Sequence, residues 1–429
     1  MRLLTILSFS AIVLALPARS ATIRVPADQP TIQAGIDAAA AIGDTVLVAA
    51  GTYYESLWYG FSGKNLVLRS EGGPESTEIA AEDEGVTFQD GEGPTAEIDG
   101  FTIRDGWLEH RSGAGIRILS SSPTIKNCVI RDCTVISNDR NVSGGGMFIS
   151  GGSPVILNCI FYENRVSFIG QPPGHGAMGG GVCCSESSPN FINCTFAENE
   201  ARAPMYSVGG GIMSLNSNLI LQGCTFYGNW AVEGGGIAST GVATVENSII
   251  AFSENGEAVL CSGSQVEFSC SDVFGNAGGD WTPCIENQLG VNGNISADPL
   301  FCDAPGGDLR LRADSPCAPG NSPPGCGLIG AWPVGCGVTD VADDSPSASL
   351  RLTVIPNPVR GVARFELGAA APVTTLNIFD AQGRLVEQLS REEGHWQWTP
   401  GSSVPAGIYF ARPGGEPASS AAVKFLYVR

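Results

Sequence analysis

The sequence predicts an all-β protein, a parallel β-helix (a solenoid of stacked coils) followed by a small β-sandwich. The first observation is compositional: glycine contributes 57 of 429 residues and charged residues only 15%, which favours a turn-rich β structure over a helical bundle or a disordered chain. The second observation is a glycine cluster that recurs through the middle of the chain. The third is a change of composition after residue 336, where cysteine disappears.

The glycine cluster marks five repeats of one structural unit. The clusters begin at Gly113, Gly144, Gly179, Gly209 and Gly234. They start 31, 35, 30 and 25 residues apart, whereas in the first four repeats a cysteine always stands 15 residues after the first glycine. One part of each repeat therefore has a fixed length and another accepts insertions, which is the pattern of a solenoid with loops on one side.

The fixed part of each repeat predicts two short strands joined at one asparagine. In residues 153–161 apolar runs flank Asn158, and Asn127 and Asn193 take the same place in their repeats. Asparagine tolerates the left-handed backbone conformation, so we expect a sharp bend at each one and hydrogen bonds between asparagines of neighbouring coils. The strands of successive coils would then pair at a spacing of about 4.8 Å.

These features resemble the right-handed parallel β-helix proteins of the pectate-lyase-like superfamily. The resemblance rests on the Gly-Gly-Gly-apolar cluster, the apolar-Asn-Cys-x-Phe run and the Glu-Asn pair that follows it at 163–164 and 198–199. Residues 23–53 also resemble the cap that begins many of these domains, and the stretch from residue 31 to residue 41 predicts a short amphipathic helix over the open end of the coils. We therefore expect a right-handed parallel β-helix with an N-terminal cap helix over residues 21–336.

The N-terminus has the pattern of a secretory signal peptide. A basic start, an apolar run from Leu3 to Leu16 and small residues at Ala18 and Ser20 predict that residues 1–20 are removed. The apolar run is short for a membrane helix and no later segment reaches its length. We therefore expect an exported protein, extracellular or at the cell surface, without a transmembrane segment.

The fourteen cysteines all lie between Cys128 and Cys336 and suit an oxidising compartment. The repeat cysteines alternate with apolar residues and are expected to point inward, either as stacked thiols or as disulfides between adjacent coils. From Cys261 on the sequence is less regular, and there we expect several disulfides in place of missing core. A CxxC pair does not occur in the sequence, which weighs against a zinc site.

The C-terminal region predicts a second unit. Residues 337–349 form a linker rich in Asp, Ser and Ala, and residues 350–429 show short strands separated by Gly, Pro and Asp turns, as in a small β-sandwich. This stretch resembles the C-terminal sorting domain of the type IX secretion system and the related immunoglobulin-like domain of the flagellar hook-capping protein. The matching motifs are Pro356-Asn357-Pro358, Asp380-x-x-Gly383-Arg384-Leu385-Val386 and Gly407-Ile408-Tyr409. The resemblance implies that secretion machinery is a partner; the alternative is an ordinary accessory sandwich.

The acidic balance of the chain limits its partners. A formal net charge of −20 argues against binding nucleic acid. It also makes an anionic polysaccharide a poor partner unless cations bridge the two. We therefore name Ca²⁺ as the candidate cofactor, and no dedicated metal-ligand set is predicted.

Two outward columns of the coils differ in the candidate catalytic residues that they contain. In enzymes that the fold resembles, catalytic groups commonly lie on the strand after the glycine cluster. Here that column holds no carboxylate, which weighs against an active site of that kind; it runs Arg117, Phe148, Cys183, Met213, Ala238.

A second column, four residues past the repeat cysteines, is acidic: Asp132, Glu163 and Glu198, then Gly228, with Arg165 beside it. It is our candidate catalytic set, because stacked carboxylates can bind Ca²⁺ or act as an acid and base pair. The alternative is that each acid caps a turn.

The variable loops contain the aromatic residues Phe168, Tyr206 and Trp230, which we name as candidate ligand-binding residues because aromatic faces stack on sugar rings. The alternative is that each ring packs on its own coil. The favoured function is binding of an extracellular polysaccharide or cell-surface glycan, or another surface ligand, without catalysis. Two alternatives stay open: a polysaccharide lyase or glycoside hydrolase, and a structural surface component.

Overall fold

The computed structural model describes residues 20–170 and 175–337, and from residue 352 to residue 427 the strands of a second unit with parts of its loops. Chain contacts divide the protein into two compact units, Met1–Val338 and Thr339–Arg429. Nearly all of the predicted signal peptide and linker lies outside the described residues. No helix of the described residues is long and apolar enough to cross a membrane.

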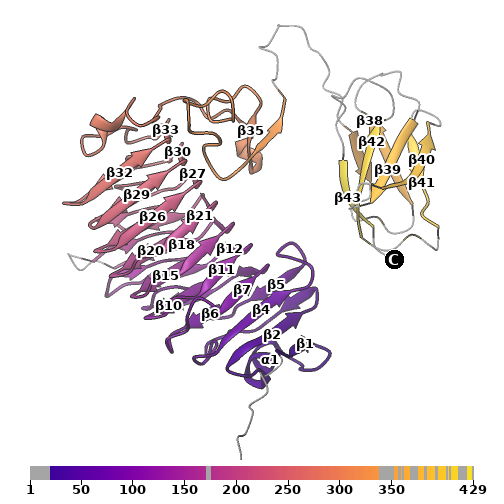
Figure 1. Ribbon diagram of the computed structural model, residues 1–429, viewed down its shortest axis with the longest axis horizontal. Coiled ribbons are helices and arrows are strands. Elements are labelled where there is room, and N and C mark those ends of the chain that lie inside the picture. Colours follow the sequence, from indigo (N-terminus) through magenta and orange to yellow (C-terminus); the bar gives the residue numbers. More distant parts are fainter. Residues whose placement is uncertain are drawn as a thin grey trace, which may run out of the picture. The chain divides into compact units, whose positions relative to one another are not determined.

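The first unit is a solenoid of parallel sheets (Figure 1). Sheet A consists of β1 (Thr22–Val25), β2 (Ile42–Val48), β4 (Asn65–Ser70), β7 (Glu97–Asp99), β11 (Thr124–Lys126), β16 (Val155–Leu157), β21 (Asn190–Ile192), β26 (Asn218–Gln222), β29 (Val242–Glu246) and β32 (Gln265–Ser269). Sheet B consists of β3 (Gly51–Tyr53), β5 (Thr77–Ala80), β8 (Thr102–Arg104), β12 (Val129–Arg131), β17 (Ile160–Tyr162), β22 (Thr195–Ala197), β27 (Thr225–Tyr227), β30 (Ile249–Ala251) and β33 (Asp272–Phe274). Sheet C consists of β6 (Val86–Phe88), β10 (Ile116–Leu119), β15 (Met147–Ser150), β20 (Val182–Ser185), β25 (Ile212–Leu215), β28 (Ile237–Ser239) and β31 (Val259–Cys261).

The loops between sheets B and C form two smaller sheets. Sheet D consists of β9 (Trp107–Glu109), β13 (Thr134–Ser137), β18 (Arg165–Phe168) and β23 (Glu200–Arg202). Sheet E consists of β14 (Val142–Ser143), β19 (Ala177–Met178) and β24 (Ser207–Val208). The insertions that separate the glycine clusters therefore stack from coil to coil instead of projecting as independent loops.

The core is built from side chains that repeat in every coil. Phe161, Phe196 and Phe226 are fully buried and pair in register along sheet B, with ring centroids 5.0 and 4.5 Å apart. Asn127, Asn158 and Asn193 each have φ of 52° at the corner between sheets A and B. The Asn158 amide donates to Asn127 at 3.1 Å, which confirms the predicted bends and the hydrogen bonds between coils.

The cap helix forms as predicted but is shorter. Helix α1 spans Ile32–Ala38, with the Thr31 hydroxyl accepting a hydrogen bond from the Ala34 amide, and Ile32 and Ile36 are fully buried. The helix ends before residue 41 because the chain enters β2 at Ile42. It packs against β1 and β2 and so covers the first edge of the coil stack.

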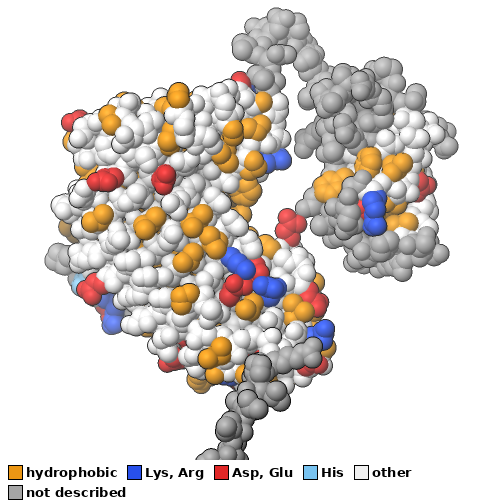
Figure 2. Space-filling view, viewed as in Figure 1, with side chains coloured by type: hydrophobic (Ala, Val, Ile, Leu, Met, Phe, Trp, Pro, Cys, Tyr) orange, Lys and Arg blue, Asp and Glu red, His pale blue; other side chains and the backbone are white. Residues whose placement is uncertain are grey.

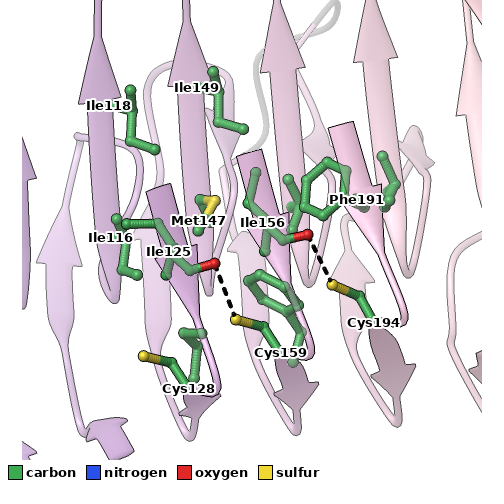
Figure 3. Close-up of a cluster of buried hydrophobic side chains, with 14 of the residues drawn as sticks. Ile116, Ile118, Ile125, Cys128, Met147, Ile149, Ile156, Cys159, Phe191 and Cys194 are labelled. Carbon is green, nitrogen blue, oxygen red and sulfur yellow. Dashed lines mark hydrogen bonds between the residues drawn. The ribbon is translucent and has the colours of Figure 1, made fainter. Parts of the chain in front are cut away.

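The repeat cysteines are buried thiols. The Cys159 thiol donates to the Ile125 carbonyl at 3.7 Å, and the Cys194 thiol to the Ile156 carbonyl at 3.5 Å (Figure 3). Of the two alternatives for this column, the structure has stacked thiols and not disulfides between adjacent coils. The prediction of several later disulfides is confirmed by Cys261–Cys284, Cys270–Cys326 and Cys302–Cys336.

The last part of the solenoid unit, residues 297–337, folds back along the outer face of sheet B, and we call it the C-terminal arm. The Ala331 amide donates to the Thr225 hydroxyl at 2.9 Å, and the Trp332 indole donates to the Thr195 hydroxyl at 2.8 Å. The arm contains β34 (Phe301–Asp303), β35 (Asp308–Arg312) and β36 (Val334–Cys336); short 3₁₀ turns occur at Glu286–Gln288, before the arm, and at Ala304–Gly306.

The second unit is a small antiparallel β-sandwich, as predicted. One sheet consists of β37 (Leu352–Ile355), β38 (Ala363–Leu367) and β41 (Trp396–Trp398), and the other of β40 (Leu385–Ser390), β39 (Thr375–Asp380), β42 (Gly407–Pro413) and β43 (Val423–Tyr427). Phe365, Trp396 and Trp398 from the first sheet share a buried core with Ile378 and Tyr409 from the second. The Pro356-Asn357-Pro358 motif lies outside the described residues.

Candidate functional site

The predicted acidic column lies at the corner that follows sheet B. Asp132, Glu163, Glu198 and Gly228 each come directly after a strand of that sheet and have φ of 56°, 52°, 55° and 62°. Because the preceding strand residues pair in register from coil to coil, these corner residues stack as predicted. The acids therefore lie at turns, and they also form one column.

A buried asparagine ladder supports this corner. Asn164, Asn199 and Asn229 are fully buried. The Asn199 amide group donates to the Asn229 side-chain oxygen at 3.0 Å and to the Phe161 carbonyl at 2.9 Å, while its own side-chain oxygen accepts from Asn164 at 3.0 Å. In each Glu-Asn pair of the sequence, the asparagine thus points inward and forms hydrogen bonds with buried polar groups of the corner, while the glutamate points outward.

The column on the other side of the corner belongs to sheet D. Thr134, Arg165 and Glu200 pair in register, and Glu200 continues to Trp230 through a β-bridge, while Trp107 precedes Thr134. Between the two columns lies a cavity of about 350 Å³, which we call the acidic groove. It is lined by Asp132, Thr134, Glu163, Asn164, Arg165, Glu198, Glu200, Gly228 and Glu254.

The structure therefore brings all four predicted catalytic residues into one groove. Sequence reasoning missed two further acids, Glu200 and Glu254. Glu200 had a readable signal, because it follows the inward Asn199 and so must point outward like Glu198. Glu254 lies in a coil where the corner position is Phe252, so counting along the acidic column does not reach it.

The two central carboxylates differ in their surroundings. Glu200 forms ion pairs with Arg202 at 2.7 Å and Arg165 at 2.6 Å, and these arginines lower the pKa of its carboxyl. Burial raises the pKa of the Glu198 carboxyl, and the neighbouring charge of Glu163 adds to that shift. The pKa shifts of these two carboxyl groups thus have opposite directions, which is the kind of difference that an acid and base pair requires.

Tyr162 links the two acids of the corner column. Its hydroxyl lies 3.1 Å from a carboxylate oxygen of Glu163 and 3.4 Å from one of Glu198. Burial and the hydrogen bond to Glu163 raise the pKa of the Tyr162 hydroxyl to about 12. Tyr162 therefore acts as a hydrogen-bond donor to this pair.

The acidic side chains are not arranged as calcium ligands. Within residues 20–170, 175–337 and the described part of the second unit, no three His, Cys, Asp or Glu side chains are placed to hold a metal ion. Glu200 is paired with two arginines and Asp132 with Arg131. The Ca²⁺ named from the sequence has no preformed site in this groove.

The three predicted aromatic residues have different positions. Phe168 is 3% exposed and packs in the solenoid core, so its ring has no free face for a ligand. Tyr206 is 46% exposed, and Trp230 is half-buried with the Arg202 guanidinium 4.7 Å from its ring centre. Trp107, which the sequence did not single out, is 48% exposed at the other end of the sheet D column.

The outward column of sheet C pairs in the predicted register but is not open to solvent along its length. Cys183, Met213 and Ala238 are buried in a separate apolar cluster with Val208, and Met178 packs against it. The reason is that the loops, expected to be variable and exposed, fold as sheet E over this face. The column therefore points outward from the core, as predicted, and is covered in these coils.

The fold and the groove define a parallel β-helix protein with an acidic surface site. The family model of the right-handed β-helix region matches residues 78–294, and the chain belongs to this family. Among solved structures, a pectin methylesterase mutant in complex with a hexasaccharide is similar, with 15% identity over 62% of this chain and 81% of that chain and a TM-score of 0.28. A likeness at this level decides nothing about activity. Among curated proteins, none matches the chain.

Proposed function

We propose that the chain is an exported β-helix protein, extracellular or at the cell surface, that binds a glycan along the acidic groove without cleaving it. The observation that carries this proposal is the pair of columns around the groove. Carboxylates accept hydrogen bonds from sugar hydroxyls. Trp107, which is 48% exposed, and Trp230, whose ring has the Arg202 guanidinium over one face, lie at the two ends of the sheet D column. Four coil steps separate these tryptophans, about 19 Å at the spacing of paired strands, which suits an oligosaccharide lying along the helix axis.

The charge of the groove limits the glycan. Glu163, Glu198 and Glu254 line the groove beside the single lining arginine, Arg165, which is paired with Glu200. A polyanionic chain would meet uncompensated carboxylates, whereas a neutral or amino-sugar chain would not. We therefore infer that the ligand is a neutral or cationic glycan.

Glycoside hydrolysis is the second candidate function. It is favoured by the opposite pKa shifts of Glu198 and Glu200, since a glycosidase needs one protonated and one ionised carboxyl group. A lyase would need a free base, and Arg165 is held by Glu200 at 2.6 Å. Non-catalytic binding is preferred because Arg165 and Arg202 both form ion pairs with Glu200, so its carboxylate is not free to act on a substrate.

The test is a screen of neutral, amino-sugar and anionic polysaccharides with the purified chain, recording bound protein and released sugar ends together. Binding of neutral or amino-sugar chains without product, weakened about tenfold or more by Trp230→Ala or by the double change Glu163→Gln and Glu198→Gln, is the expected result. Arg312→Ala in the C-terminal arm is the control for a remote charge change. Product release that disappears in Glu198→Gln would replace the proposal with a hydrolase; binding only of anionic chains would overturn it.

Delivery by the second unit is part of the proposal. Its sandwich fold and its resemblance to a sorting domain support a role as an export signal read by secretion machinery. Removing residues 350–429 should leave the protein inside the cell envelope, as measured by fractionation. Normal release of the truncated chain would show that this unit has another role.

A further inference from the structure

The first coils carry a polar group on the outer face of sheet C that the groove does not use. Leu57 forms a β-bridge with Val86, so Trp58 lies beside Thr87 at the head of the column that continues through Arg117. Trp58 is 43% exposed. The side chains of Arg111 and Arg117 are 33% and 25% exposed. These side chains therefore reach the surface where sheet E does not cover the column.

A buried carboxylate organises the group. Glu84 is 1% exposed; it accepts a hydrogen bond from the Thr87 hydroxyl at 2.5 Å and pairs with Arg111 at 2.6 Å. An Arg117 nitrogen lies 3.7 Å from the same carboxylate. The Arg111 guanidinium lies 4.1 Å from the centre of the Trp58 ring. Two guanidinium groups share one carboxylate, which leaves one positive charge in excess.

The loop that carries Trp58 is held in place by its backbone. Gly60 has φ of 49°, and a Cβ there would lie 1.8 Å from the Thr87 carbonyl oxygen. The Leu57 amide donates to the Gly85 carbonyl and the Thr87 amide to the Leu57 carbonyl. The tryptophan and the arginines are thus positioned before any ligand arrives, which lowers the entropic cost of binding.

The solenoid contains its own comparison for this position. In later coils the same column is apolar and buried, at Cys183, Met213 and Ala238. The fold therefore does not require charged residues here. A buried carboxylate under two arginines contributes little to stability relative to apolar packing, so the charged version in the first coils points to binding.

We propose that Arg111, Arg117 and Trp58 form a binding site for an oxyanion group, a carboxylate or a sulfate, carried by a sugar-sized ligand. Guanidinium groups match the oxygens of such anions with paired hydrogen bonds. The tryptophan supplies the apolar contact beside them. The site has the opposite charge preference to the acidic groove and does not depend on the function proposed for it.

The test titrates the full chain with sodium glucuronate and, separately, with glucose 6-sulfate, using glucose as the neutral probe. Binding is followed by calorimetry and by tryptophan fluorescence. We expect saturable binding of at least one anion and none of glucose, with a fluorescence change that Trp58→Phe abolishes. Comparison of the two anions identifies the preferred oxyanion.

Arg117→Ala should weaken binding at least tenfold, and Arg117→Lys should weaken it less, because lysine keeps the charge and loses the paired hydrogen bonds. Arg117 is the safer residue to change, since the pair between Glu84 and Arg111 remains. The matched control is Arg69→Ala on sheet A, which removes an arginine paired with Glu97 and Asp99. Figure 2 shows acidic and basic side chains gathered over the N-terminal coils, where such pairs are ordinary surface features.

Absence of saturable anion binding, or an equal effect of Arg117→Ala and Arg69→Ala, would overturn the proposal. The double change Glu163→Gln and Glu198→Gln should leave anion binding unchanged, so failure of this site and failure of the acidic groove can be told apart. A thermal melt of each variant confirms that it is folded.

Discussion

The regular coils and the C-terminal arm are held together by different means. In the regular coils the repeat cysteines are free thiols, and each coil shares hydrogen bonds and stacked side chains with the next. At the end of the stack and in the arm the repeat is lost, and three disulfides appear. Ladders of identical residues stabilise a solenoid only where coils are in register; beyond that point covalent links take over.

The largest expected loss of stability distinguishes the buried asparagine ladder, which contains Asn199, from the exposed asparagine corner, which contains Asn158. Asn199→Ala should destabilise the solenoid by about 3–5 kcal/mol, because it removes the buried side-chain hydrogen bonds that Asn199 forms with Asn164, Asn229 and Phe161. Asn158→Ala, at an exposed corner with φ of 52°, should cost only about 1 kcal/mol. Denaturant unfolding of both variants makes the comparison, and equal losses would show that the inner ladder has no special weight.

Next in size is the disulfide that ties the arm to the coils. Replacing Cys270 and Cys326 by serine opens a loop with a sequence separation of 56 residues and should cost about 2–4 kcal/mol. The loss should be local, with new protease cleavage in the arm and an unchanged core. If the regular coils lose protection equally, the two regions unfold as one unit and the contrast fails.

A change of pH should act where the arm packs on the last coil, because Asp272 of β33 contacts the arm there. Asp272 is fully buried, its carboxylate accepts from the Ala297 amide and the Cys317 thiol, and burial raises its pKa from 3.8 to about 7. The folded state binds this proton more tightly, so the stabilisation is complete below pH 3.8 and is lost as the pH rises towards 7. We expect the arm to be about 2–3 kcal/mol less stable at pH 8 than at pH 5.

Hydrogen exchange of arm amides measures this slope. Asp272→Asn should flatten it, while Asp303→Asn, an exposed change in the arm, should not. An unchanged slope in Asp272→Asn would assign the effect to another group.

The smallest effect concerns the thiols. Ser248 continues the cysteine column and its hydroxyl donates to the Glu246 carbonyl, as the Cys159 thiol donates to Leu157. Cys159→Ser should therefore cost only about 1 kcal/mol, and reductant should leave the regular coils unchanged. If Cys159→Ser lost more unfolding free energy than removal of the Cys270–Cys326 disulfide, the regular coils would depend on their cysteines more than the arm does, contrary to this prediction.

Much of the fold could be read from the sequence because a solenoid repeats its local rules. The constant distance from glycine cluster to cysteine placed Asn158 at a bend and Glu163 in a column, and both positions are as predicted. The inserted segments were harder, since their strands form only by pairing with neighbouring insertions. Phe168 was expected in a loop and lies instead at the end of β18, where alternation turns it inward.

The binding group around Trp58 could not be found by counting. Trp58, Glu84 and Arg111 precede the first glycine cluster, so no repeat aligns them with Arg117, the one member that lies in a predicted column. The disulfide partners likewise depend on how the arm folds back, which brings Cys270 to Cys326 across 56 residues of sequence. Both features come from contacts between segments with no common spacing.

The corner column sets the length of the acidic groove in whole coils. Each additional coil would lengthen the groove by about 4.8 Å, whatever the length of the loop inserted opposite. Gain or loss of one coil by internal duplication or deletion would therefore change the length of the groove while keeping every corner contact. The length of this surface site can therefore change in evolution only in steps of one coil.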